Sequence, residues 1–401
     1  MANWEMQPLG NVLTFQRGFD ITKAEQQEGP YWVISSSGPK STNEQYKVEG
    51  PGVIIGRKGS LGTVFYSEAN YWPHDTTLWV KDFHGNNPRF AYDYLQTMGL
   101  ERLDACSSNP SLNRNHIHTI PVMWPSLPLQ RRIAGILSAY DDLIENSQRR
   151  IKILEEMARR LYREWFVHFR FPGHEDCRFV ASPLGEIPEG WEVKPLEEIA
   201  EVVRRNVPKG KTSETKAYVG LEHIPRRSLA LDAWEHITEL GSNKLAFCKG
   251  EVLFGKIRPY FHKVSVAPFD GVCSADTIVI RSISERDYAF VVACVSSDKF
   301  VAEASASANG AKMPRASWDV LKRFSVVIPR SGDIAGQFSG LLTDVLSQQQ
   351  TLVFQIQNLR CTRDIILPRL LSGQINVEAL PDPSATANVL PDVAESLIRF
   401  P

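Results

Sequence analysis

The chain has 401 residues, of which 43% are hydrophobic and 23% charged, and its formal net charge is −1. This composition is typical of a globular protein of two or three domains, and the charge gives no sign of the basic surface that DNA-binding domains often carry. No apolar run is long enough to span a bilayer, and the first residues lack a signal peptide's basic start and apolar core, so we expect a cytoplasmic protein. The 6 cysteines form no CxxC pair, which argues against a zinc ribbon or a disulfide framework.

Short motifs recur in the same order in the two halves of the chain, which predicts two half-repeats of about two hundred residues each. WEMQPL at residues 4–9 returns as WEVKPL at residues 191–196, an offset of 187. The Gly-Arg of GVIIGRKGSLG (52–62) matches the Gly-Lys of EVLFGKIRPYF (251–261). Further matches pair residues 74–80 with 274–280, 109–117 with 309–317, and the IAG at 133–135 with the IAG at 334–336.

Each half begins with short β-rich runs and ends with a long helical pattern. VIIG, TVFY and TLWV in the first half, and VLFG, TIVI and FVVACV in the second, are broken by Gly, Pro, Ser and Asn, which is typical of strands joined by loops. Prolines in IPVMWPSLPLQ (120–130) keep a helix from starting early. We therefore expect two globules of the α/β class, with mixed α+β structure, each followed by a helix.

The helical part of each half carries an apolar seven-residue repeat. In the first half every seam position from Ile133 to Trp165 is apolar except Ser147. The second seam has Gln348 at the equivalent place, and Pro368 is expected to end that helix. The predicted seam residues are Ile133, Leu137, Tyr140, Ile144, Ile151, Leu154 and Leu161 in the first helix, and Ile334, Phe338, Leu341, Val345, Leu352, Leu359 and Ile366 in the second.

A single apolar stripe on a long helix needs a partner. A helix of about 34 residues is about 50 Å long, and the equivalent helix of the other half can cover its stripe. Charged residues such as Glu155 and Arg160 are expected off the seam. The alternative is that both helices belong to the cores of two ordinary α/β domains.

No catalytic or metal-binding signature is evident. SGPKST (37–42) lacks two glycines of a phosphate-binding loop, and neither NPPY, DPPY nor GxSxG occurs. The three glycines within 56–62 are not followed by a clear helix pattern, so they do not favour a dinucleotide site. The histidines within 74–75 and 116–118 have no further ligands at suitable spacing, so we expect them at the surface or at strand ends and predict no metal.

One segment resembles a known family. LPLQRRIAGILSAYDDLIENSQRRIKILEEMARRLYREWFVHFRFPG (127–173) resembles the central spacer region of specificity subunits of type I restriction-modification enzymes. WEVKPLEEIAEVV (191–203), GEVLFGKIRPYFHKV (250–264) and GRKGSLG (56–62) are similar to recurrent motifs of the target-recognition domains of that family. The resemblance covers the whole chain except the tail after Asn376.

The resemblance implies a subunit without a catalytic centre, in which two pseudo-repeated target-recognition domains each read one half of a bipartite DNA site. It implies that the two spacer helices form an antiparallel coiled coil, on which modification subunits, expected to be two, and a restriction translocase subunit assemble. Those partners would bring S-adenosylmethionine, ATP and Mg, and this chain would bind no cofactor itself. The implied parts are recognition domain 1 (1–125), spacer helix 1 (126–172), a linker (173–182), recognition domain 2 (183–329), spacer helix 2 (330–375) and a tail (376–401).

Two other functions remain open from the residues alone. One is a non-enzymatic coiled-coil scaffold that binds proteins and has no DNA specificity. The other is an enzyme whose motif is not recognised.

Polar and basic residues in the repeated loops are the candidate DNA contacts. Glycines allow close approach to a phosphate or a groove edge, and Arg and Asn can pair with guanine and adenine edges. The candidates are Arg57, Lys58, Ser60, Asn109, Asn113, Arg114 and Asn115 in the first half, and Arg204, Arg205, Lys256, Arg258, Tyr260, Lys312 and Arg315 in the second. Trp4 and Trp191 are expected in the core rather than as platforms for base stacking.

Overall fold

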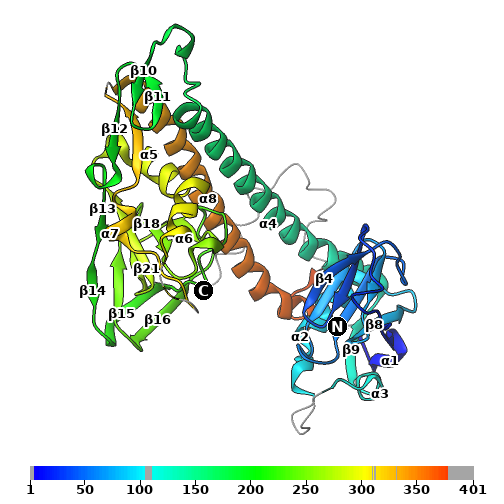
Figure 1. Ribbon diagram of the computed structural model, residues 1–401. Coiled ribbons are helices and arrows are strands. Elements are labelled where there is room, and N and C mark those ends of the chain that lie inside the picture. The colour runs from blue at the N-terminus through cyan, green and yellow to red at the C-terminus, as the bar shows by residue number, and fades with distance from the viewer. Residues whose placement is uncertain (1–3, 104–110, 309, 311–312, 331, 378–401) are drawn as a thin grey trace. The chain divides into compact units, whose positions relative to one another are not determined.

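The computed structural model describes residues 4–103, 111–308, 310, 313–330 and 332–377 (Figure 1). The chain forms two compact units. The first takes in Met1–Asp142 and Arg360–Pro401, and the second takes in Leu143–Leu359. Among the described residues, no helix combines the length and apolar character needed to cross a lipid bilayer.

The first unit has a four-stranded sheet of order β2-β8-β5-β6, a three-stranded sheet of order β4-β3-β7, and the pair β1-β9. Its core packs one face of the larger sheet, with Phe15, Ile55 and Leu78, against helix α2 with Phe90 and Leu95. The elements are β1 (Trp4–Pro8), α1 (Leu9–Val12), β2 (Thr14–Arg17), β3 (Tyr31–Ser35), β4 (Gly38–Asn43), β5 (Gly52–Gly56), β6 (Val64–Ser67), β7 (Tyr71–Pro73), β8 (Thr77–Asp82), α2 (Pro88–Thr97), α3 (Arg114–His118) and β9 (Pro121–Pro125).

The second unit has a four-stranded sheet of order β13-β21-β18-β19, a five-stranded sheet of order β14-β17-β20-β15-β16, and the pairs β12-β22 and β10-β11. The elements are β10 (Phe179–Ser182), β11 (Gly185–Pro188), β12 (Trp191–Pro195), β13 (Ala200–Val203), β14 (Arg205–Val207), β15 (Gly210–Val219), β16 (Glu235–Leu240), β17 (Lys244–Phe247), β18 (Val252–Gly255), β19 (Val264–Val266), β20 (Gly271–Ser274), β21 (Thr277–Ser282), α5 (Glu285–Val295), α6 (Asp298–Ala306), α7 (Trp318–Leu321) and β22 (Ser325–Pro329).

The predicted repeat appears in the strand pairing. The sheets β2-β8-β5-β6 and β13-β21-β18-β19 have the same order, and Gly56 faces Thr77 as Gly255 faces Thr277. Trp4 and Trp191 also begin equivalent antiparallel pairs, β1-β9 and β12-β22. Trp191 is buried as expected, whereas Trp4 is half-buried at the margin of its core. Both globules therefore share one mixed α/β plan.

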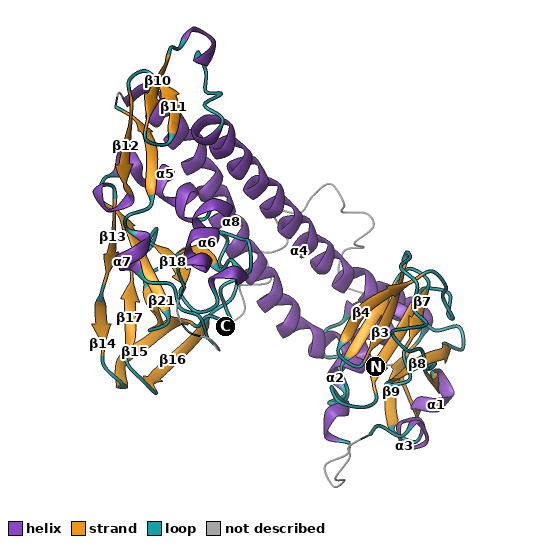
Figure 2. Cartoon of the chain, in the orientation of Figure 1, coloured by secondary structure: helices purple, strands orange, loops and turns teal. Residues whose placement is uncertain are grey.

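Two long helices follow the globular segments (Figure 2). Helix α4 spans Leu127–Tyr162 and continues as a π-helical turn, Arg163–Val167, and helix α8 spans Gly332–Leu371. In the second unit, Ile151 of α4 shares a core with Leu352 and Ile356 of α8, while the later Phe166 packs on the earlier Phe338. The two helices therefore run antiparallel within this unit.

The first unit contains the other portions of the same two helices. Ile133 and Leu137, near the start of α4, share a core with Leu370 and Leu371, at the end of α8. Here too the early part of one helix packs against the late part of the other.

The first helix buries its predicted stripe more closely than the second. Of the residues named for α4, Ile133, Leu137, Ile144 and Ile151 are buried, and Tyr140, Leu154 and Leu161 are half-buried. Of those named for α8, Phe338 and Leu352 are buried, Ile334, Val345, Leu359 and Ile366 are half-buried, and Leu341 is 49% exposed.

The prediction that Leu341 lies on the seam is therefore wrong. Its neighbour Leu342 is buried instead, and the buried polar residue of α8 is Gln349 rather than Gln348. The reason is that the start of α8 packs against its own globule as well as against α4: Phe338 and Leu342 lie in one core with Phe290 and Val326. The globule therefore decides which face of α8 is covered.

One further expectation about the helices is wrong. Pro368 does not end α8, which continues to Leu371; the carbonyl of Pro368 still accepts a hydrogen bond from Ser372 N at 2.9 Å. The proline removes the backbone donor to the carbonyl four residues earlier, but only three residues of helix follow it. Glu155 contacts a loop of the globule rather than the other helix, in keeping with its predicted place off the seam, but it is only 4% exposed.

Candidate nucleic-acid interface

The two loops that carry most of the predicted contacts of the first half meet at one turn. The backbone N–H groups of Arg57 and Lys58 both donate to the carbonyl of Thr76, at 2.8 and 3.1 Å. On the other side Leu112 N donates to the carbonyl of Arg57 at 3.0 Å, and Lys58 forms a β-bridge with Ser111. Segments far apart in sequence therefore form one continuous polar edge.

The second unit repeats this arrangement with different side chains. Lys256 N donates to the carbonyl of Asp276 at 3.0 Å, and Ala316 N donates to the carbonyl of Lys256 at 2.9 Å. Ile257 forms the β-bridge, here with Arg315. Lys256, Asp276 and Ala316 are thus the structural equivalents of Arg57, Thr76 and Leu112. The same backbone frame carries different side chains, as expected of two modules that recognise different targets.

The side chains of the first loop, residues 56–62, are accessible in part. Lys58 and Ser60 are exposed, whereas Arg57 is half-buried, with its Nη1 atom buried. The loop requires glycine at residue 62, where φ is +72° and a Cβ atom would lie 2.4 Å from the backbone nitrogen of Glu101. This backbone holds Lys58 and Ser60 outward at the edge.

The second predicted segment of the first half forms the short helix α3. Asn113 caps it, because its side-chain oxygen accepts from Asn115 N at 3.0 Å. Arg114 and Asn115 are exposed on its first turn. Asn109 lies outside the described residues.

In the second unit several candidate side chains already have protein partners. Lys256 Nζ donates to the carbonyl of Ala275 at 2.6 Å and lies 3.5 Å from Asp276 Oδ1. Arg315 Nη2 lies 3.7 Å from the same carboxylate oxygen. Asp276 therefore draws both cations together at this edge.

The other candidates of the second unit differ in exposure. Arg258 has a left-handed backbone with φ of +48°, and the neighbouring Tyr260 is 56% exposed. Arg204 is exposed just after β13. Lys312 lies outside the described residues.

Arg205 has a structural partner. Its Nη1 and Nη2 atoms lie 2.7 and 2.8 Å from the two carboxylate oxygens of Glu251, whose side chain is 5% exposed. Cys248 N donates to the same carboxylate at 2.8 Å. This bidentate geometry fixes the guanidinium within the protein, which favours a role in folding over a role in DNA contact.

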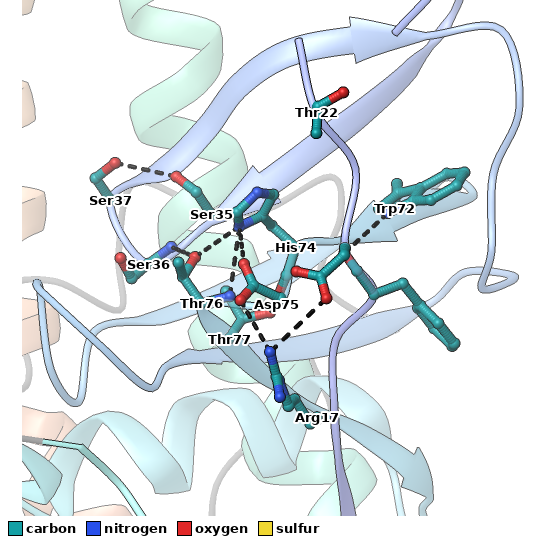
Figure 3. Close-up of polar contacts among 12 residues, drawn as sticks. Arg17, Thr22, Ser35, Ser36, Ser37, Trp72, His74, Asp75, Thr76 and Thr77 are labelled. Atoms are coloured by element: carbon teal, nitrogen blue, oxygen red, sulfur yellow. Dashed lines mark hydrogen bonds and ion pairs between the residues drawn. The ribbon is translucent and has the colours of Figure 1, made fainter. Parts of the chain in front are cut away.

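A polar cluster beside the first loop was not predicted (Figure 3). Arg17 Nη2 lies 3.0 Å from Asp75 Oδ2, and His74 Nδ1 lies 2.9 Å from Asp75 Oδ1. Thr76 Oγ1 contacts His74 Nδ1 at 3.0 Å and accepts from Ser36 N at 3.3 Å. The repeat offset of 187 places Arg17 on the candidate Arg204, so the sequence did hold a signal for Arg17.

Of the two histidines within 116–118, His116 is exposed and His118 has a structural role. His118 Nε2 accepts a hydrogen bond from Phe15 N at 3.0 Å, and its ring stacks on Phe15 with centroids 5.7 Å apart. Burial, with a smaller contribution from the charge of Arg114, lowers the pKa of His118. In the described ranges no group of three or more His, Cys, Asp or Glu side chains is arranged to hold a metal ion.

Comparisons with known proteins agree on one family. Residues 1–156 match the family described as the type I restriction modification DNA specificity domain. The chain is 26% identical over 291 residues to the type I restriction enzyme MjaIX specificity subunit of Methanocaldococcus jannaschii, an alignment that covers 70% of this chain and 66% of that protein. It is 22% identical over 313 residues to the EcoDI specificity subunit of Escherichia coli, covering 72% of this chain and 70% of that protein.

A solved structure shares the fold. The S subunit of a type I restriction-modification system from M. genitalium superposes with a TM-score of 0.61 at 14% sequence identity, covering 92% of this chain and 96% of that one. The MjaVIII specificity subunit of M. jannaschii is 32% identical over 225 residues, half of each chain.

Proposed function

We propose that the chain is a specificity subunit of a type I restriction-modification system, that is, the DNA-recognition subunit of such a complex without catalysis of its own; the family match and the similar specificity subunits support this. The observation that carries this proposal is the duplicated polar edge. In each unit the same three backbone segments meet, at Arg57, Thr76 and Leu112 and again at Lys256, Asp276 and Ala316. Two equivalent edges with different side chains suit a bipartite target with two different halves.

Within this proposal each recognition domain reads one half of the DNA site. Residues 1–125 form the first recognition domain and 183–329 the second, joined through a linker at 173–182. In this proposal Lys58, Ser60 and Arg114 of the first domain contact DNA, and their exposure supports that role. We propose that the protein acts on DNA in the cytoplasm.

The long helices have a spacing and assembly role in the proposal. Residues 126–172 and 330–375 form an antiparallel coiled-coil spacer, supported by the antiparallel packing within each unit. Two modification subunits and a restriction translocase dock on this spacer and bring S-adenosylmethionine, ATP and Mg. Because the chain has a net charge of −1, these partners also supply much of the positive charge that holds DNA.

A domain exchange tests the proposal. Residues 1–125 are replaced by the same region of a relative, the hybrid is expressed with its modification subunits, and methylated bases are located by single-molecule sequencing. Only one half of the methylated site should change. Exchange of residues 183–329 is the matched control and should change only the other half. A site that changes in both halves, or in neither, contradicts the proposal.

A further inference from the structure

Arg17 lies at the polar edge where the predicted DNA-contacting loops of the first unit meet. It ends strand β2, and the next two residues are held to the 73–77 segment: Gly18 N donates to the carbonyl of Thr77 at 3.0 Å, and Phe19 N donates to the carbonyl of Pro73 at 2.8 Å. The same short segment accepts the backbone N–H groups of Arg57 and Lys58 through Thr76. The 73–77 segment therefore holds the end of β2, with Arg17, next to the first loop at residues 56–62.

The side chain of Arg17 is accessible and yet held in place. It is 51% exposed, while its partner Asp75 is 20% exposed. Arg17 Nη2 lies 3.0 Å from Asp75 Oδ2 and 3.9 Å from Asp20 Oδ2. Asp75 is itself held from the other side by His74, whose Nδ1 atom lies 2.9 Å from Oδ1 (Figure 3). The carboxylate thus limits the rotamers of an arginine that would otherwise be free in solvent.

We infer that Arg17 reads a guanine in the half-site of the first recognition domain and that Asp75 is its positioning residue; this inference rests on the proposed function. A guanidinium has more N–H donors than the contact with Asp75 uses, and they lie in one plane. A planar pair of donors matches O6 and N7 of guanine in the major groove, which is the commonest specific arginine contact. Fixing the arginine before binding reduces the side-chain entropy lost on contact.

The equivalent position of the second unit lacks a carboxylate that could position the arginine. Arg204 is the counterpart of Arg17 at the repeat offset of 187, and it is exposed. The counterparts of His74 and Asp75 are Ser274 and Ala275, so no carboxylate stands at the place of Asp75. An exposed arginine without such a carboxylate suits a phosphate, which needs charge but little orientation. Arg17 therefore contributes to sequence preference, and Arg204 to affinity for any sequence.

The experiment uses the full chain assembled with its modification subunits and a library of DNA duplexes with randomised bases. Bound duplexes are sequenced for the wild-type protein and for Arg17→Ala, Arg17→Lys, Asp75→Asn and Arg204→Ala. Arg178→Ala, which removes an exposed arginine from the linker at 173–182, is the matched control. The Arg17 and Asp75 variants should fold, because an ion pair with a half-exposed arginine contributes little to stability, and the other two arginines are exposed.

The wild-type protein should enrich a bipartite motif with a guanine in the half that the domain exchange assigns to residues 1–125. Arg17→Ala should lower the preference for that guanine about tenfold or more and leave all other positions unchanged. Arg17→Lys should keep overall affinity and lose the preference, because an ammonium group lacks the planar pair of donors. Asp75→Asn should lower the preference less than Arg17→Ala does. Arg204→Ala should weaken binding to all sequences alike, and Arg178→Ala should bind as the wild type does.

The outcomes separate this inference from the proposed function. If the wild-type complex enriches no motif, the proposed function fails. If it enriches a motif that Arg17→Ala leaves unchanged at every position, the inference is overturned while the proposed function stands. Equal guanine preference in Asp75→Asn and the wild type overturns the positioning role of Asp75.

Discussion

Glu155 offers the sharpest test of how the second unit is built. This residue of α4 is 4% exposed, and its Oε1 atom accepts from Ser228 Oγ at 2.6 Å, Leu229 N at 2.7 Å and Ala230 N at 3.2 Å. The carboxylate thus ties a loop of the globule to the long helix. We expect Glu155→Ala to release that loop.

The magnitude follows from the donors left behind. Leu229 N would lose its acceptor inside the protein, which costs about 1–3 kcal/mol, whereas Ala230 N keeps a 3.3 Å contact with Ser228 Oγ. Loss of the remaining hydrogen bonds adds about 1 kcal/mol. The substitution also removes the cost of burying the carboxylate, so we expect a net loss of about 2 kcal/mol. Glu155→Gln keeps a carbonyl acceptor and should cost less.

Amide hydrogen exchange of the 228–230 segment measures this local effect directly. A loss of about 2 kcal/mol corresponds to exchange about 30-fold faster in Glu155→Ala. The exposed Glu145 of the same helix provides the matched control: Glu145→Gln should leave the segment unchanged. Unchanged exchange in Glu155→Ala would refute the reasoning that this carboxylate holds the loop.

The same residue predicts a pH dependence. Burial raises the pKa of Glu155 above its ordinary value of 4.5, and the hydrogen bonds from Ser228, Ala230 and Leu229 oppose that rise only in part. Because the folded pKa is the higher one, the associated stability is present below pH 4.5 and is lost as the pH rises through the folded value. Glu155→Gln has no such dependence, so its stability relative to the wild type should increase with pH over that window, as followed by urea unfolding.

Three further predictions test other parts of the fold. Phe338→Ala empties a site that is 1% exposed and should cost about 3–5 kcal/mol in urea unfolding, whereas Leu341→Ala, at a position 49% exposed, should change the midpoint little. Arg205→Ala leaves the carboxylate of Glu251 buried without its cation and should cost up to about 3 kcal/mol; a loss of DNA affinity without loss of stability would contradict the structural role. Burial raises the pKa of Asp93 from 3.8 to about 7, so its contribution is present below pH 3.8 and is lost as the pH rises through about 7. Asp93→Asn should therefore raise the melting temperature relative to the wild type more at pH 8 than at pH 5, and an equal difference at both would contradict this assignment.

The sequence by itself determined the repeat and the long helices. Motifs that recur in the same order predicted two equivalent globules, and the strand orders β2-β8-β5-β6 and β13-β21-β18-β19 agree with that prediction. The seven-residue pattern predicted helices that the structure places at Leu127–Tyr162 and Gly332–Leu371. These features are readable because backbone periodicity and chain duplication leave local marks along the sequence.

Only the tertiary structure decided which side chains meet. Arg17 and Asp75 are 58 positions apart, and Glu155 and Leu229 are 74 apart, so no local pattern joins them. The sequence suggested Arg205 as a DNA contact, and only the fold shows that its guanidinium is bound by Glu251. Leu341 fits the seven-residue repeat, yet it is exposed. A helix buries the face that its neighbours cover, and those neighbours come from distant parts of the chain.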